Sequence, residues 1–305
     1  MRRTMWLFFA FIGPVCWAAS THIDKYLVDR YFRDSDTVVL IVFTSLIGIL
    51  MLPVIAWFVP RVFALSFLSI SVMTVSGVMY MGAMLFYLRA IQSEEASVVA
   101  PLFQTTTVFT FVLAYLLLGE MLTWRGVAGA GLIVVGVLLL SLDGRLRLRR
   151  FRRPVVLYML ACTFILALAN VIFKYYAVED AFWPVTFWTF VGEALFGLGI
   201  LMIPRNRQQF VRLLKANTGA LVGVNGVNEV INLGGGLGVR YAFLLAPVAL
   251  VSAVASTTTL FVFAFGTLLT VLAPRFSQED ISRGNLARKA ACAVVVTAGV
   301  LLARQ

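Results

Sequence analysis

The stretch ALVGVNGVNEVINLGGGLGV (residues 220–239) decides the fold, because it joins a membrane-spanning length of apolar residues and glycines to a row of polar side chains. Asn225, Asn228, Glu229 and Asn232 follow the spacing i, i+3, i+4, i+7, which places all four on one face of a helix. A charged residue at the centre of a spanning helix costs about 2.5–3.5 kcal/mol on insertion scales. We therefore expect this face to line the interior of a helix bundle, with its four polar residues along the pathway of a polar solute.

The whole chain has the composition of an integral membrane protein. Of its 305 residues, 61% are hydrophobic and 13% are charged, whereas soluble domains average about 45–50% apolar and about 25% charged residues. Its mean hydropathy is +0.95. Because about 20 apolar residues are needed to cross a bilayer, the sequence predicts an all-α protein with ten transmembrane helices. They are expected at residues 5–23, 37–59, 66–88, 96–118, 124–142, 155–174, 182–203, 218–239, 246–272 and 286–303.

The two halves of the chain echo each other. STHIDKY (residues 20–26) corresponds to ANVIFKY (169–175), and QTTTVFTF (104–111) corresponds to STTTLFVF (256–263), at nearly constant offsets. A linker with six arginines between residues 145 and 153 separates the halves. These matches predict an internal repeat of five helices.

An odd number of helices forces the second copy to cross the membrane in the opposite direction to the first. The sequence therefore predicts two inverted five-helix repeats, residues 1–148 and 149–305, around a central cavity. Secondary transporters are built in this way, with a site near the midplane where the repeats meet. At the same offset, the polar face of residues 225–232 falls on Met73, Ser76, Gly77 and Tyr80 of the first repeat, so its asparagines and its glutamate are not repeated. A solute without symmetry of its own requires such an arrangement.

Two motifs connect the chain to a known family. GPVCWAASTHIDKY (residues 13–26), with Trp17, and LGEMLTWRGVAGAGLIVVGVLL (118–139), with Gly119 and Glu120, resemble the EamA-type permeases of the drug/metabolite transporter superfamily. The resemblance extends over essentially the whole chain and implies export or exchange of small metabolites across a bacterial inner membrane. Such families often place Gly-Glu before the last helix of each repeat, and here the second repeat lacks it.

Other candidate residues of the substrate pathway lie in or near the predicted helices. Glu193 lies in the middle of its helix and is either a proton- or substrate-binding carboxylate or a carboxylate tied to neighbouring groups. Lys25 and Lys174 end their helices, where a lysine either extends to the membrane interface or faces the cavity and pairs with Glu193 or a substrate carboxylate. His22, the only histidine, either changes its protonation state near neutral pH or simply forms a hydrogen bond.

Glycines and prolines near these residues are candidate hinges, because they permit either close helix packing or a local break that frees backbone groups to line a cavity. The expected hinge residues are Gly234, Gly235, Gly236, Pro101 and Pro247. Repeat matching adds two polar residues to the substrate pathway, Asn170 and Gln104.

Several functions receive little support from the sequence. The sequence contains one histidine, no HExxH motif, and three cysteines at unrelated spacings. It therefore offers neither a set of catalytic residues nor a metal site, and we expect no cofactor. No GxxxxGK[ST] motif couples the chain to ATP. The net charge of +11 lies in short loops, where it meets lipid headgroups and not nucleic acid.

The predicted function is a secondary transporter that moves a small polar or amphipathic metabolite across the inner membrane by alternating access, with a proton as the candidate coupling ion. A flippase for a lipid-linked sugar, a membrane-embedded enzyme and a membrane scaffold remain as alternatives. The family resemblance implies that both termini lie in the cytoplasm, whereas the loop charges favour the reverse, with the arginine-rich linker in the cytoplasm and both termini outside. In this assignment one side carries only seven of the 25 lysines and arginines, namely Arg2, Arg3, Arg61, Arg125, Lys174, Arg240 and Arg304.

Overall fold

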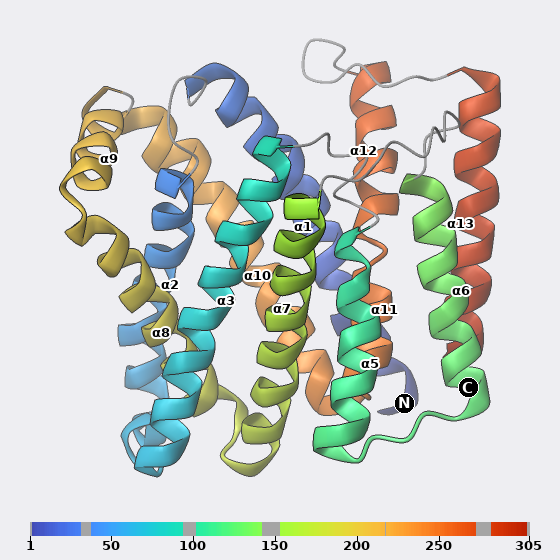
Figure 1. Cartoon of the computed structure of the whole chain (residues 1–305), viewed down its shortest axis with the longest axis horizontal. Coiled ribbons are helices and arrows are strands. Elements are labelled where there is room, and N and C mark those ends of the chain that lie inside the picture. The colour runs from blue at the N-terminus through green and yellow to red at the C-terminus, as the bar shows by residue number, and fades with distance from the viewer. Residues whose placement is uncertain are drawn as a thin grey trace.

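The chain is a bundle of helices in the computed structural model, which describes residues 2–31, 38–93, 102–141, 153–216, 218–272 and 282–303 (Figure 1). In chain order the helices are α1 (Arg2–Tyr31), α2 (Val38–Phe58), the 3₁₀ helix η1 (Pro60–Phe63), α3 (Phe67–Ser93), α5 (Thr105–Leu118), α6 (Trp124–Ser141), α7 (Arg153–Glu179), α8 (Phe182–Met202), α9 (Pro204–Ala216), the π-helix η2 (Ala220–Asn225), α10 (Gly226–Leu245), α11 (Val248–Ala255), α12 (Thr258–Leu272) and α13 (Arg283–Ala303).

Seven helical segments of the described chain are long and apolar enough to cross a membrane: α1, α2, α3, α7, α8, α13, and α11 taken together with α12. The helices α5 and α6 are apolar but shorter. The predicted all-α class is therefore confirmed, and the chain is a multi-pass membrane protein. Figure 1 shows that α1 begins and α13 ends at one end of the bundle, and that α9 lies at the other end.

Glycines bring pairs of helices into backbone contact. An added Cβ at Gly77 of α3 would overlap the carbonyl oxygen of Thr189 on α8, and one at Gly192 of α8 would overlap the carbonyl oxygen of Thr74 on α3. The helices α6 and α13 approach in the same way, because a Cβ at Gly129 would lie 2.7 Å from the carbonyl oxygen of Gly299. Small residues allow such close approach in membrane proteins, where packing holds helices together.

The structure corrects several of the predicted boundaries. The helices α1 and α7 continue to Tyr31 and Glu179, so Lys25 and Lys174 do not end their helices as expected. Residues 204–216 form the helix α9, where we expected only a loop. The predicted helix 246–272 is divided into α11 and α12, which are separated at Ser256 and Thr257. The helix expected to end at residue 239 continues to Leu245, so that Arg240 belongs to α10 and not to a loop.

Candidate substrate pathway

Three polar clusters follow one another along α10. The first contains Asn228 and Glu229 near the start of the helix, the second contains Arg240, and the third lies at the carbonyl oxygen of Ala246, just after the helix ends. At a rise of about 1.5 Å per residue, Glu229 and Arg240 are about 16 Å apart along the helix axis, and Ala246 lies about 9 Å further. The clusters are therefore distributed over most of the thickness of a bilayer.

The first cluster joins α10 to α1 and α2. The amide Nδ2 of Asn228 donates a 2.6 Å hydrogen bond to Oδ1 of Asp24 on α1. The hydroxyl of Thr44 on α2 donates a 2.9 Å hydrogen bond to Oε1 of Glu229. Asn225, Asn228 and Glu229 are at most 4% exposed, whereas Asn232 is half-buried, so three of the four residues of the polar face are buried in the bundle.

Two acceptor atoms of this cluster are left without a hydrogen bond in the part of the chain that the structure describes. Within the described residues, Oδ1 of Asn228 and Oε2 of Glu229 are buried and accept no hydrogen bond of standard geometry. The side chain of Asn232, nearly one turn further along α10, interacts with the same Glu229 carboxylate. A buried acceptor without a partner costs about 1–3 kcal/mol. The cluster can therefore bind an N–H or O–H donor of a solute, or a proton on Glu229.

The second cluster is an ion pair surrounded by aromatic rings. Nη2 of Arg240 lies 2.6 Å from Oε1 of Glu193 on α8, and the two side chains are only 14% and 8% exposed. The guanidinium carbon lies 5.2 Å from the ring centre of Phe190, 5.4 Å from that of Phe173 and 5.8 Å from that of Tyr80. Aromatic faces attract a cation electrostatically, most strongly where water is excluded. If this ion pair opens, Arg240 can bind an anionic group of a solute and Glu193 can bind a cationic group.

Sequence reasoning missed Arg240 because the predicted helix ended one residue before it. The signal that could have found it is Pro247, since a helix usually ends at or before the residue that precedes a proline. With the helix extended to Leu245, Arg240 becomes a buried charge that requires a partner. Neither Arg240 nor Lys174 therefore belongs among the loop cations that were assigned to one membrane surface.

The third cluster contains Lys174. We considered Glu193 as the partner of this lysine, but Glu193 lies in the second cluster. Lys174 forms an ion pair with Glu120 and donates a 2.8 Å hydrogen bond to the carbonyl oxygen of Ala246. The backbone N–H of Val248, the first residue of α11, donates a 2.9 Å hydrogen bond to Oε2 of Glu120. A carboxylate is stabilising at a helix N-terminus, so Glu120 caps α11 and ties together the two halves of the chain.

Replacing Glu120 by Ala is expected to lower the free energy of unfolding by about 1–3 kcal/mol, because the variant loses the cap of α11 and leaves Lys174 without its anion. The pair is 14–15% exposed, which keeps the expected loss below that of a fully buried pair. The melting temperature of the purified protein in detergent measures the change. Glu179→Ala, at an exposed residue that ends α7, is the control, and equal shifts in the two variants would contradict the capping role.

The other candidates of the substrate pathway lie at separate places. Nε2 of His22 on α1 lies 3.0 Å from the carbonyl oxygen of Val262 on α12, so this histidine has a backbone partner. Gln104 is buried just before α5, and Asn170 is half-buried on α7. Lys25 belongs to α1, but its side chain lies outside the described part of the structure.

The candidate hinges occupy different environments. Gly234, Gly235 and Gly236 continue the regular helix α10. A Cβ at Gly235 would lie 3.0 Å from Cβ of Cys16 on α1, whereas one at Gly234 or Gly236 would meet nothing within 4 Å. Pro247 precedes α11 at the turn from α10, and Pro101 lies outside the described residues. The irregular backbone of this region is instead the π-helix η2, which ends at Asn225.

A hollow of about 530 Å³ opens at the end of the bundle where η1 lies, and Phe182 and Tyr241 are among the residues that line it. The ring of Phe182 contacts those of Phe173 and Tyr241, at centroid distances of 6.0 and 5.5 Å. Phe173 in turn faces Arg240. Aromatic rings therefore lie between this hollow and the buried ion pair. Within the described residues, no three His, Cys, Asp or Glu side chains form a group that could hold a metal ion.

Comparisons with known proteins concern the family and the fold of the chain. Residues 4–142 match the EamA-like transporter family. A solved protein crystal structure superposes with a TM-score of 0.66 at 18% sequence identity, and the match covers 98% of this chain and 97% of that chain. The two proteins therefore share a fold over nearly their whole length. No curated protein matches the chain.

Proposed function

Because residues 4–142 of this multi-pass membrane protein match the EamA-like transporter family, we propose that the chain is a secondary transporter. Its substrate is a small polar or amphipathic metabolite, which crosses a bacterial inner membrane by alternating access. The observation that carries the proposal is the buried row of polar groups along α10, with unsatisfied acceptors on Asn228 and Glu229. A row of this kind is expensive in a membrane protein and is typical of a solute or ion pathway.

The proposed architecture has ten crossings in two inverted repeats, residues 1–148 and 149–305. The crossings are the seven apolar segments together with α5, α6 and the η2–α10 helix. The opposite directions of α1 and α7, which begin at opposite ends of the bundle in Figure 1, support an inverted relation. The sequence matches between residues 20–26 and 169–175 fall on these same two helices.

In the proposed site, the solute meets the polar groups along α10 in sequence. Asn228 and Glu229 accept hydrogen bonds from its N–H or O–H groups, and Arg240 and Glu193 bind its charged groups when their ion pair opens. The aromatic side chains of Phe173 and Phe182 close the path on the side of the 530 Å³ hollow. Rocking of α10 and α11 at Pro247 would expose the site to the two sides in turn.

Replacing Glu229 by Gln is expected to reduce transport at least tenfold, because the amide keeps the shape of the side chain and the bond from Thr44 but can neither carry a negative charge nor exchange a proton. A comparison of metabolites released by cells that overproduce or lack the protein first identifies a transported compound. Its efflux is then measured for each variant and divided by the amount of protein in the membrane.

Glu179→Gln is the matched control, since Glu179 is exposed at the end of α7 and stands outside the proposed site. It should transport at the rate of the unmodified protein. Full activity of Glu229→Gln at normal abundance would reject Glu229 as a functional residue. An identical metabolite profile with and without the protein would reject the transporter itself.

A further inference from the structure

The helix α9 has two distinct faces. Its sequence PRNRQQFVRLLKA contains four cations and no acidic residue. On the inner face, the ring of Phe210 lies 4.7 Å from that of Phe43 on α2, and Leu213 packs in the cluster around the buried Leu27 of α1. The apolar side of α9 is therefore docked on the bundle, and its cations remain on the outside.

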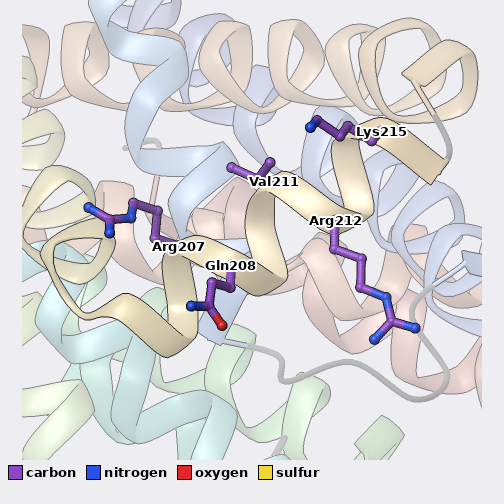
Figure 2. Close-up of a pocket in the computed structure, with 5 residues that line it drawn as sticks. All are labelled: Arg207, Gln208, Val211, Arg212 and Lys215. Carbon is purple, nitrogen blue, oxygen red and sulfur yellow. The ribbon is translucent and has the colours of Figure 1, made fainter.

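The outer face is a basic surface with a shallow hollow. Arg207, Gln208, Val211, Arg212 and Lys215 line a hollow of about 660 Å³, and Figure 2 shows their side chains projecting outward, with Arg207 and Lys215 toward the two ends of α9. Four of these side chains are polar, Val211 is apolar, and all five are exposed. Within the described part of the chain, none of the three cations forms an ion pair.

The position of α9 determines which part of the membrane its basic surface contacts. The apolar segment Phe182–Met202 ends only two residues before Pro204, where α9 begins. A helix that starts directly at the end of a membrane-spanning segment lies at the level of the lipid headgroups. Basic amphipathic helices at this depth are attracted to anionic lipids. It is also the end of the bundle that the loop charges assign to the cytoplasm.

We propose that the outer face of α9 is a binding site for the headgroup of an anionic phospholipid. The phosphate accepts charge-assisted hydrogen bonds from the guanidinium groups of Arg207 and Arg212, which match its oxygens in pairs. Lys215 adds a third positive charge, and Gln208 can donate to a headgroup hydroxyl. Val211, at the centre of the face, contacts the apolar glycerol and acyl region. This inference concerns the membrane contact of the protein and does not depend on what it transports.

The test is a titration of the full-length protein in detergent, followed by native mass spectrometry. Phosphatidylglycerol and phosphatidylcholine with the same acyl chains are the two lipid probes. We expect phosphatidylglycerol to bind more tightly, and Arg212→Gln to weaken this binding about fivefold, the contribution of one cation near an anionic membrane. Arg205→Gln removes the same charge from the same helix, but Arg205 does not line the hollow and the variant should change binding less than twofold.

The variant Arg207→Gln, Arg212→Gln, Lys215→Gln should retain one phosphatidylglycerol molecule fewer per chain, with an unchanged melting temperature in detergent. Equal affinity for the two lipids would overturn the proposal. So would an equal loss in Arg205→Gln and Arg212→Gln, which would mean that only the overall charge matters. Displacement of the lipid by an equal concentration of inorganic phosphate would show a free-anion site in place of a lipid site.

Discussion

Replacing Arg240 by Met is expected to destabilise the protein by about 3–5 kcal/mol, because it leaves the buried carboxylate of Glu193 without its cation. Glu193 is 6% exposed and accepts a 2.6 Å hydrogen bond from the guanidinium of Arg240. The variant also removes the cation from the rings of Phe173 and Phe190, whose contacts are worth about 2 kcal/mol when desolvated. The melting temperature in detergent and the amount of protein in the membrane should both fall.

The double variant Arg240→Met, Glu193→Gln separates the charge from the packing. It removes both ions and should recover much of the lost stability, since a buried pair can often be replaced by neutral groups of similar volume. Arg61→Met, at an exposed cation of η1, controls for the loss of one arginine and should have little effect. A melting temperature of Arg240→Met equal to that of the unmodified protein would show that the pair does not stabilise the fold.

The double variant also bears on function. If Arg240 and Glu193 bind charged groups of the solute, the neutral double variant should fold and reach the membrane but lose transport. If the pair only holds α8 and α10 together, transport should return with stability. Stability and transport measured on the same two variants therefore distinguish a binding role from a structural one.

The sequence predicted the apolar helices and the buried polar face, because both depend on local patterns. An apolar run of about 20 residues has few alternatives to a spanning helix. The spacing of Asn225, Asn228 and Glu229 defines one face regardless of neighbours, and all three are buried. Hydropathy could not find α9, because that helix is polar on one side and its apolar residues Phe210, Leu213 and Leu214 are visible only as a helical period.

The pairing of charges was less predictable, because it depends on which helices become neighbours. Glu120 of the first half meets Lys174 and Val248 of the second half, and nothing in the repeat pattern assigns these partners. The missing Gly-Glu in the second repeat argued against a role of Glu120 shared by both halves, but it identified no partner. Charges in a membrane protein must be satisfied, but only the packing of α7, α8, α10 and α11 determines by which partner.

Replacing Gly192 by Ala is expected to be the most damaging single-methyl change in α8. An added Cβ would overlap the carbonyl oxygen of Thr74 and lie 2.8 Å from its carbonyl carbon and 3.1 Å from Cα of Gly77, so the three nearest atoms all belong to the backbone of α3. No side chain can rotate away, and α3 and α8 must separate. Overpacking costs about 1–3 kcal/mol and sometimes more, which exceeds the gain of about 1 kcal/mol from the better helix propensity of alanine.

Gly199, two turns further along the same helix, is the matched control. A Cβ at Gly199 would meet nothing within 4 Å, so Gly199→Ala gains the helix propensity without the clash and should be neutral or stabilising. Both variants gain the same helix propensity, so we expect them to differ by the overpacking cost alone, about 1–3 kcal/mol in stability, measured by melting in detergent. Because Glu193 follows Gly192 directly, separation of α3 from α8 must also move this carboxylate relative to Arg240 and Tyr80. Gly192→Ala should therefore impair transport more than its loss of folded protein explains. Equal melting temperatures of Gly192→Ala and Gly199→Ala would mean that α3 and α8 can adjust their spacing freely.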